Sequence, residues 1–203
     1  MSHSLDEFPP DGARPGEIPL DARRSVPARQ LGDPGPDAAM LLRLLRSAVR
    51  VPDHGRRVPF RFQRIAGDAR GALGELLARR ALARDPGSSD AVLEKERARF
   101  SRAPLVLAVV AVLGPDDAIP ESERFSTASC VCFALLQAAQ AFGFGAQWLT
   151  GWAAYDREVL DALGLGGDER IAGFVHIGTP MQAAPERDRP DPAALLTDWR
   201  PPG

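Results

Sequence analysis

The chain has 203 residues, of which 44% are hydrophobic, and a formal net charge of −2 at pH 7. This length and hydrophobic content predict a single domain with a substantial core. Since the charge is nearly balanced, we expect no general affinity for nucleic acid or for an anionic membrane surface. The N-terminus has no signal pattern, and no apolar run approaches the roughly 20 residues of a membrane span, so we expect a cytoplasmic protein.

The first residues differ in composition from the rest of the chain. Residues 1–17 are rich in proline, glycine and charge, and such a segment cannot bury enough apolar surface to fold. We therefore expect a disordered tail over residues 1–17 and one folded domain over residues 18–203.

The first half of the domain is predicted to hold three helices and one strand. Asp37 is predicted to cap a helix over residues 37–50, where apolar residues recur at helical spacing before a proline. Residues 59–66 alternate like a strand. Residues 67–83 and 88–100 read as two further helices, the first weakened by internal glycines.

The second half alternates strands and helices. Residues 103–113 form an aliphatic, valine-rich run that predicts a fully buried central strand. Residues 121–142 become apolar almost all round, which is typical of a helix buried on most sides by its own core or by a partner subunit. A strand over 146–152, a helix over 156–165 and a last strand over 170–180 follow. This order predicts an α+β or α/β layer fold with a small mixed sheet flanked by helices.

The only two cysteines, Cys130 and Cys132, lie in the apolar helical segment. A spacing of one residue is poor for a disulfide, and no matching pair of histidines is present to complete a zinc site. We expect both cysteine side chains to be buried, and we expect no metal site.

Two basic clusters are candidates for holding an anion. Arg23, Arg24 and Ser25 offer two guanidinium forks and a hydroxyl, a good combination for a phosphate group. Arg50 and His54 lie in a second basic stretch between a helix and a strand. For both clusters a solvated, purely structural role remains open.

The later strands carry further candidates. Trp148 and Thr150 lie where a strand enters a loop, and the indole is open to a core role or a cofactor contact. His176 alternates with apolar residues in the last strand, so we expect it to be half-buried and structural. No nucleophile–base pair can be identified in the sequence, so we assign no catalytic side chain. The chain thus offers hydrogen-bond donors for an anion but no identifiable general acid or base. This combination favours an enzyme whose cofactor carries out the chemistry.

In order and spacing, five segments resemble the FMN-dependent nitroreductase superfamily, in its compact, single-domain NAD(P)H nitroreductase branch. They are RRS (23–25), RVPDH (50–54), FSRAPLVLAVVA (100–111), CFALLQAAQAFGFGAQWLTG (132–151) and IAGFVHIGTP (171–180). The resemblance implies an α+β fold and an intertwined homodimer. It also implies two FMN sites at the dimer interface, each lined by both chains.

The resemblance also assigns cofactor-binding residues. Arg23–Ser25 would hold the FMN phosphate and ribityl end from one subunit, and Arg50 and His54 would reach the same flavin from the other. Trp148–Thr150, which includes Leu149, matches the segment that runs along the cofactor. Ala138 matches a position assigned to contact with the nicotinamide cofactor.

The activity implied by the resemblance is a ping-pong reaction. NADH or NADPH delivers hydride to flavin N5 and leaves, and a small electron-poor acceptor such as a nitroaromatic or a quinone is then reduced in the same slot. One alternative is a degenerate family member that binds flavin or a partner without redox turnover. Val58 and Leu149 favour it, because they stand where the branch usually has polar or basic residues. Another flavin chemistry, dehalogenation or oxidative breakdown of FMN, is also open.

Overall fold

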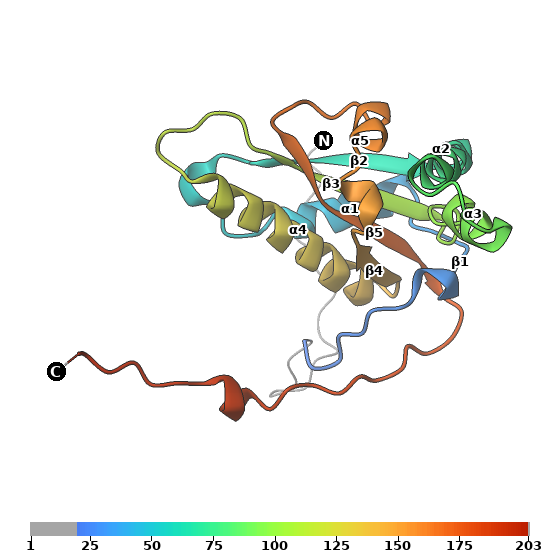
Figure 1. The fold of residues 1–203 in the computed structure, drawn as a ribbon. Helices are drawn as coiled ribbons and strands as arrows, with labels where there is room; N and C mark the ends of the chain where they lie inside the picture. Colours follow the sequence, from blue (N-terminus) through green and yellow to red (C-terminus); the bar gives the residue numbers. More distant parts are fainter. Residues whose placement is uncertain (1–19, 203) are drawn as a thin grey trace, which may run out of the picture.

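The computed structural model describes residues 20–202, so the tail expected over residues 1–17 lies outside the described part. The helices and strands follow the predicted order (Figure 1). Each predicted element is present, with bounds that differ from the expected ones by a few residues. The α+β class is confirmed.

The centre of the molecule is a five-stranded sheet. β3 (Leu105–Val112) lies between β2 (Phe60–Ala66) and β5 (Glu169–Pro180). The other edge of β5 pairs with β4 (Gly145–Leu149) and with the short β1 (Leu31–Gly32). All of these pairings are antiparallel, so the mixed sheet expected from the sequence is wrong for the described residues.

One face of the sheet is covered by α1 (Ala38–Ala48) and α4 (Glu121–Ala141) (Figure 1). Asp37 caps α1 as predicted, because its carboxylate accepts a hydrogen bond from the backbone N–H of Met40 at 2.7 Å. Every second side chain of β3 points into this core, where Leu44 of α1 is fully buried. α4 therefore buries one side on the sheet.

The opposite face is covered by α2 (Asp68–Arg84) and α5 (Arg157–Ala162), and α3 (Asp90–Arg97) packs on α2. One of the glycines expected to weaken α2, Gly74, is required by the packing of this helix. A Cβ on Gly74 would lie 2.1 Å from the carbonyl oxygen of Arg97, so only glycine allows this close approach.

Three local expectations are wrong. Cys132 is buried but Cys130 is exposed, because residues two apart on a helix face different sides. His176 is 1% exposed, so it is fully buried and not half-buried. The strand predicted over 146–152 ends at Leu149, because Gly151 has a positive φ of 73° and begins a 3₁₀ turn, Trp152–Ala154.

Residues 181–202 form the C-terminal arm. Its start lies on the body, where Ala184 packs against the cluster of Val26, and the rest extends away from the molecule (Figure 1). The arm's only regular structure is a 3₁₀ turn, Pro192–Leu195. Leu195, Leu196 and Trp199 are 70%, 76% and 81% exposed. The arm therefore presents large apolar side chains that no other described residues cover.

In the described part of the chain, no helix combines the length and apolar character needed to span a membrane.

Candidate functional site

The N-terminal segment (22–28) lies against β4. The backbone N–H of Val26 donates to the carbonyl of Ala146 at 3.0 Å, and the N–H of Ala28 donates to Oε1 of Gln147 at 2.6 Å. These bonds bring the first basic cluster of the sequence next to the strand that carries Trp148, although the two are more than 100 residues apart.

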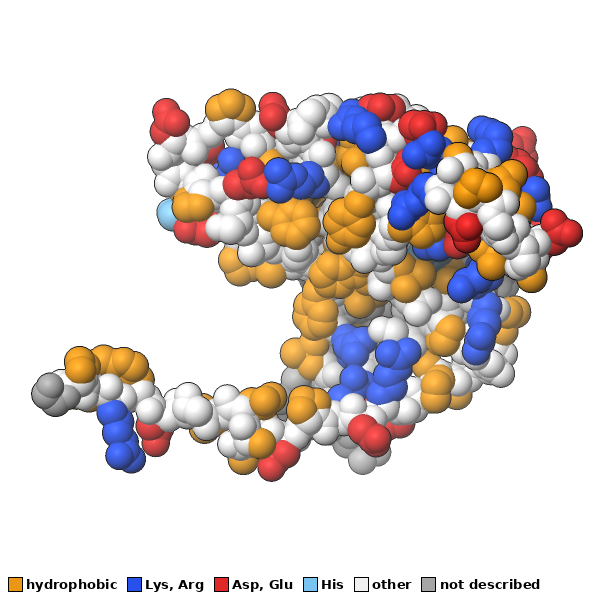
Figure 2. Space-filling model, viewed as in Figure 1, with side chains coloured by type: hydrophobic (Ala, Val, Ile, Leu, Met, Phe, Trp, Pro, Cys, Tyr) orange, Lys and Arg blue, Asp and Glu red, His pale blue; other side chains and the backbone are white. Residues whose placement is uncertain are grey.

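A pocket of about 450 Å³ opens at this junction. Its walls include Gln147 and Leu149 of β4, and none of the lining residues within 20–202 is a carboxylate. Five of the lining side chains are cations, namely Arg29, Lys95, Arg99, Arg102 and Arg187. Figure 2 shows Lys and Arg side chains gathered on this side of the molecule, near α3 and the N-terminal segment. We call this cavity the cationic pocket.

Arg99 is the most firmly held of the five cations. Its Nε and Nη2 atoms donate to the two carboxylate oxygens of the buried Glu96, at 2.8 and 2.6 Å. Its guanidinium also lies 5.9 Å from the ring centre of Trp152. Among the described residues, the other four cations form no ion pair. The pocket therefore carries a strong, largely uncompensated positive charge.

His176 lies beside this charge, inside the protein. Burial, and then the nearby charges of Arg99 and Arg102, lower its pKa to about 4, so the imidazole is neutral near pH 7. Its ring stacks on Phe100, with centroids 5.9 Å apart, and its buried Nδ1 has no hydrogen-bond partner among residues 20–202. Gln147 is its cross-strand neighbour on β4, so both side chains lie on the same face of the sheet.

The predicted cofactor-binding residues 148–150, at the end of β4 and in the loop after it, lie partly in the pocket and partly in the core. Leu149 is exposed and lines the cationic pocket, and Thr150 follows it, half-buried. The indole Nε1 of Trp148 donates to the carbonyl of Ala172 at 3.1 Å. The indole packs so closely over Gly173 that an added Cβ would lie 1.9 Å from Nε1. Trp148 is thus tied to β5.

The predicted phosphate-binding cluster lies just outside the cationic pocket. Arg23 donates from Nη1 to the hydroxyl of Ser25 at 3.2 Å. Arg24 forms an ion pair with Glu186, whose neighbour Arg187 lines the pocket. The cluster therefore borders the pocket wall formed by the start of the C-terminal arm.

Ala138 is buried in the core between α4 and the sheet. In the single chain it presents almost no surface to a ligand.

The second basic cluster lies elsewhere. His54 lines a separate pocket of about 340 Å³ with Glu123, Thr127 and Cys130 of α4. Nδ1 of His54 lies 2.8 Å from a carboxylate oxygen of Glu123. Arg50, just after α1, is exposed.

The loop that carries His54 is held in a strained conformation. Val58 has a φ of 49°, which is rare for a β-branched residue. The carboxylate of Asp53 stabilises it by accepting hydrogen bonds from the backbone N–H groups of Arg57 and Val58, at 3.1 and 2.8 Å. The guanidinium of Arg57 in turn binds Asp116 at 2.7 Å and holds the pKa of that carboxyl at about 2.

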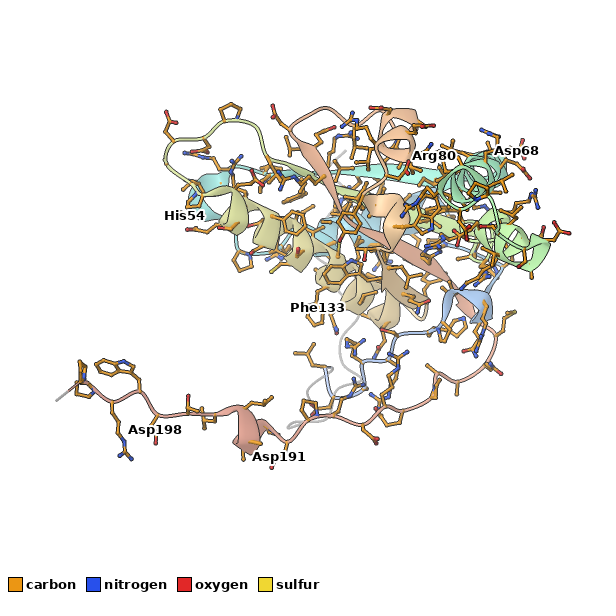
Figure 3. The ribbon with its side chains drawn as sticks, in the orientation of Figure 1. His54, Asp68, Arg80, Phe133, Asp191 and Asp198 are labelled. Atoms are coloured by element: carbon orange, nitrogen blue, oxygen red, sulfur yellow. The ribbon has the colours of Figure 1, made fainter. Side chains whose placement is uncertain are left out.

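The two basic clusters lie at opposite ends of α4. His54 contacts Glu123 in its first turn, while the N-terminal segment contacts Gln140 in its last turn. At 1.5 Å per residue, these contacts are about 25 Å apart along the helix. Figure 3 shows His54 at one end of α4 and Phe133 in its second half. One chain cannot bring both clusters to a single small ligand.

Four of the five pocket cations were not singled out from the sequence: Lys95, Arg99, Arg102 and Arg187. The first three belong to α3 and the turn after it, where a run of charge is typical of a solvated helix. Arg187 belongs to the proline-broken C-terminal region. Arg29 lies close to the first cluster in the sequence, but only the folded chain places it in the pocket.

The profile of the Nitroreductase family matches residues 20–179. The chain is also 35% identical, over 176 residues, to YdjA of Escherichia coli (strain K12), a protein named as a candidate NAD(P)H nitroreductase. That match covers 86% of this chain and 94% of the relative. A candidate NAD(P)H nitroreductase of Haemophilus influenzae is 33% identical, with 77% of this chain and 84% of the relative covered.

The chain belongs to the nitroreductase family. Solved structures agree with this assignment at the level of the fold. A nitroreductase-like protein from Bacillus cereus has a TM-score of 0.74 and 23% identity, covering 89% of this chain and 94% of that one. A nitroreductase with bound FMN from Bacteroides fragilis has a TM-score of 0.65 and 20% identity, covering 90% and 97%. The nitroreductase fold is therefore built here from a chain that covers nearly the full length of these relatives.

Proposed function

We propose that this nitroreductase-family chain is an FMN-dependent oxidoreductase. It takes reducing equivalents from NADH or NADPH and reduces electron-poor acceptors such as nitroaromatics or quinones. The observation that carries the proposal is the cationic pocket at the junction of the N-terminal segment and β4. The names of the relatives and the FMN-bound structures of fold neighbours support the same cofactor and reductant.

The cationic pocket fits the phosphate end of FMN. A phosphate monoester carries a charge of about −1.5 to −2 at pH 7 and offers three strong acceptor oxygens. The described part of the chain supplies five cations and no carboxylate to the pocket, and planar guanidinium forks match phosphate oxygens well. Its volume of about 450 Å³ lies within the range of ordinary small-molecule sites.

The residues of the chain bind and orient the cofactor. Arg23 and Ser25, joined to each other by a hydrogen bond, would donate to phosphate oxygens at the edge of the pocket, with Arg102 donating from α3's side. Leu149 would offer an apolar contact to the flavin ring. Bound FMN supplies the redox chemistry, since a flavin exchanges hydride and electrons with nicotinamides and acceptors. The protein then needs no nucleophile of its own, and His176 stays neutral beside the guanidinium groups.

The proposal extends to a homodimer in which Arg50 and His54 of one copy complete the site of the other. Its support is the separation of the two clusters by about 25 Å along α4, which one chain cannot close. Phe133 on α4 is 41% exposed, and the C-terminal arm exposes three large apolar side chains. A second copy of the same chain would cover these surfaces.

A second candidate function is a flavin-binding dimer without redox turnover. The apolar Leu149 in the pocket and the apolar Val58 near His54 favour it, because neither side chain can donate a hydrogen bond to a flavin ring.

Two measurements on the purified full-length protein test the proposal. The protein is expected to be yellow, or to become yellow with added FMN, at about one FMN per chain. Anaerobic addition of NADH or NADPH is then expected to bleach the flavin absorbance, and a nitroaromatic or quinone to restore it. Protein that takes up no FMN would contradict both functions. Bound flavin that neither nucleotide bleaches would leave only the second.

A further inference from the structure

The N-terminal segment has no helix or strand of its own around Arg23–Ser25. Among the described residues, the side chain of Arg24 pairs with Glu186, and the backbone before Val26 is tied to the body by one side chain, Gln140 in the last turn of α4. Its Oε1 accepts a hydrogen bond from the backbone N–H of Arg24 at 3.3 Å. Its Nε2 donates to the carbonyl of Ala22 at 3.1 Å.

The side-chain amide of Gln140 therefore acts as a substitute for a neighbouring strand. Its two bonds reach the backbone on either side of Arg23. Gln140 is itself well anchored, because the adjoining Ala138 and Ala139 are buried in the core beneath α4. The position of the Arg23 backbone is thus fixed from the core of the molecule.

Without these bonds, the first backbone tie to the body is the bond from Val26 to β4. The segment that carries both arginines and the serine would then have many more conformations. Ordering it on a ligand would cost conformational entropy that the native contacts have already removed.

We propose that Gln140 is a positioning residue for phosphate recognition, acting through the backbone of Arg23 and Arg24 and not by contact with the ligand. This inference rests on the proposed FMN function. It assigns to α4 a role in selecting a phosphorylated flavin over an unphosphorylated one.

The test compares FMN with riboflavin, which has the same ring and ribityl chain but no phosphate. Both are titrated by fluorescence quenching into deflavinated, full-length protein. Gln140→Met is nearly isosteric and removes both hydrogen bonds. It is expected to weaken FMN binding about tenfold while leaving riboflavin binding nearly unchanged. Riboflavin thus serves as an internal reference for correctly folded protein.

Gln137→Met is the matched control, one turn earlier on the same helix. The buried Nε2 of Gln137 has no hydrogen-bond partner in the described part of the chain, so the change removes no hydrogen bond to residues 22–28. We expect its ratio of FMN to riboflavin affinity to equal that of the wild type. In an Arg23→Ala, Arg24→Ala background, Gln140→Met is expected to lose most of its effect on that ratio.

Three results would overturn the inference: an unchanged ratio in Gln140→Met, an equal loss for FMN and riboflavin, or a full effect that persists without the two arginines. A wild-type protein that binds FMN no better than riboflavin would overturn the proposed phosphate site itself. The two failures are distinguishable, because the second is seen before any substitution is made.

Discussion

At the scale of single residues, the proposed site depends on where guanidinium groups are fixed. The carboxylate of Glu96 holds Arg99 in one orientation, and the Ser25 hydroxyl accepts a bond from Arg23. An arginine held in this way loses little additional side-chain entropy when it binds an anion. The local sequence around each residue supplies only part of this arrangement, since the partners come from separate segments.

Arg23→Ala tests the phosphate contact directly. A charged hydrogen bond contributes about 1.5–3 kcal/mol, so we expect the FMN affinity to fall by about tenfold or more. The measurement is FMN titration by fluorescence or calorimetry. Arg79→Ala is the control, because Arg79 is exposed on α2 and forms no ion pair among the described residues. Equal affinities for the wild type and Arg23→Ala would place the phosphate elsewhere.

At the scale of elements, β5 joins the site to the core. It pairs with β3, β4 and β1, and its glycine at 173 makes room for Trp148 of β4. The order of elements and most of their types could be predicted from hydrophobic periodicity. The antiparallel direction of every pair could not, because periodicity within a strand contains no information about its neighbour.

Gly173→Ala is expected to displace the Trp148 indole and to break its hydrogen bond to Ala172. Overpacking of this kind costs about 1–3 kcal/mol, so the unfolding midpoint in urea should fall and the tryptophan emission should shift. Gly167→Ala is the control, since a Cβ there meets nothing within 4 Å. If both variants unfolded like the wild type, the close packing of Trp148 on β5 would be wrong.

An ion pair between β2 and β5 gives the sheet a predictable response to acid. The Arg61 guanidinium binds Glu169 with bonds of 2.6 and 2.8 Å and lowers the pKa of that carboxyl to about 2 from 4.5. A lowered pKa stabilises the folded state above the unfolded value, and that stabilisation is lost as the pH falls from about 4.5 towards 2.

Glu169→Gln is therefore expected to be less stable than the wild type at pH 7, and to lose less stability between pH 5 and pH 3. Urea unfolding at several pH values measures both effects. Asp117→Asn is the control, because it removes an exposed carboxylate that forms no ion pair among the described residues. The ion pair would have no such role if Glu169→Gln and the wild type lost stability in parallel.

At the scale of the whole molecule, the described chain is half of the proposed site. The cationic pocket and the pocket of His54 are separated by the length of α4. In a two-fold symmetric dimer, the cationic pocket of each chain would meet the His54 pocket of its partner, which gives two equivalent sites. The sequence predicted that α4 is apolar almost all round. In the folded chain one side of α4 is buried on the sheet, whereas the side that carries Cys130 and Phe133 is exposed.

We expect the wild type to have the mass of two chains by light scattering. Phe133→Asp should shift the equilibrium towards single chains and reduce FMN retention, because a buried, unpaired carboxylate opposes association. Tyr155→Asp is the control: Tyr155 is 74% exposed but lies outside α4 and the C-terminal arm. A two-chain mass for Phe133→Asp would contradict an interface at this part of α4.

The sequence by itself determined the family, the order of helices and strands, the Asp37 cap and the apolar character of α4. The family rests on the order and spacing of five segments. The elements, the cap and the character of α4 depend on local propensity and periodicity, which a single segment contains in full. Only the tertiary structure decided that Lys95, Arg99, Arg102 and Arg187 meet Arg29 around one pocket. It alone decided that Gln140 ties down the segment of Arg23, and that His54 lies about 25 Å away along α4. The physical reason is that the charge of a pocket depends on which distant segments the core brings side by side. Local sequence patterns contain no information about these long-range contacts.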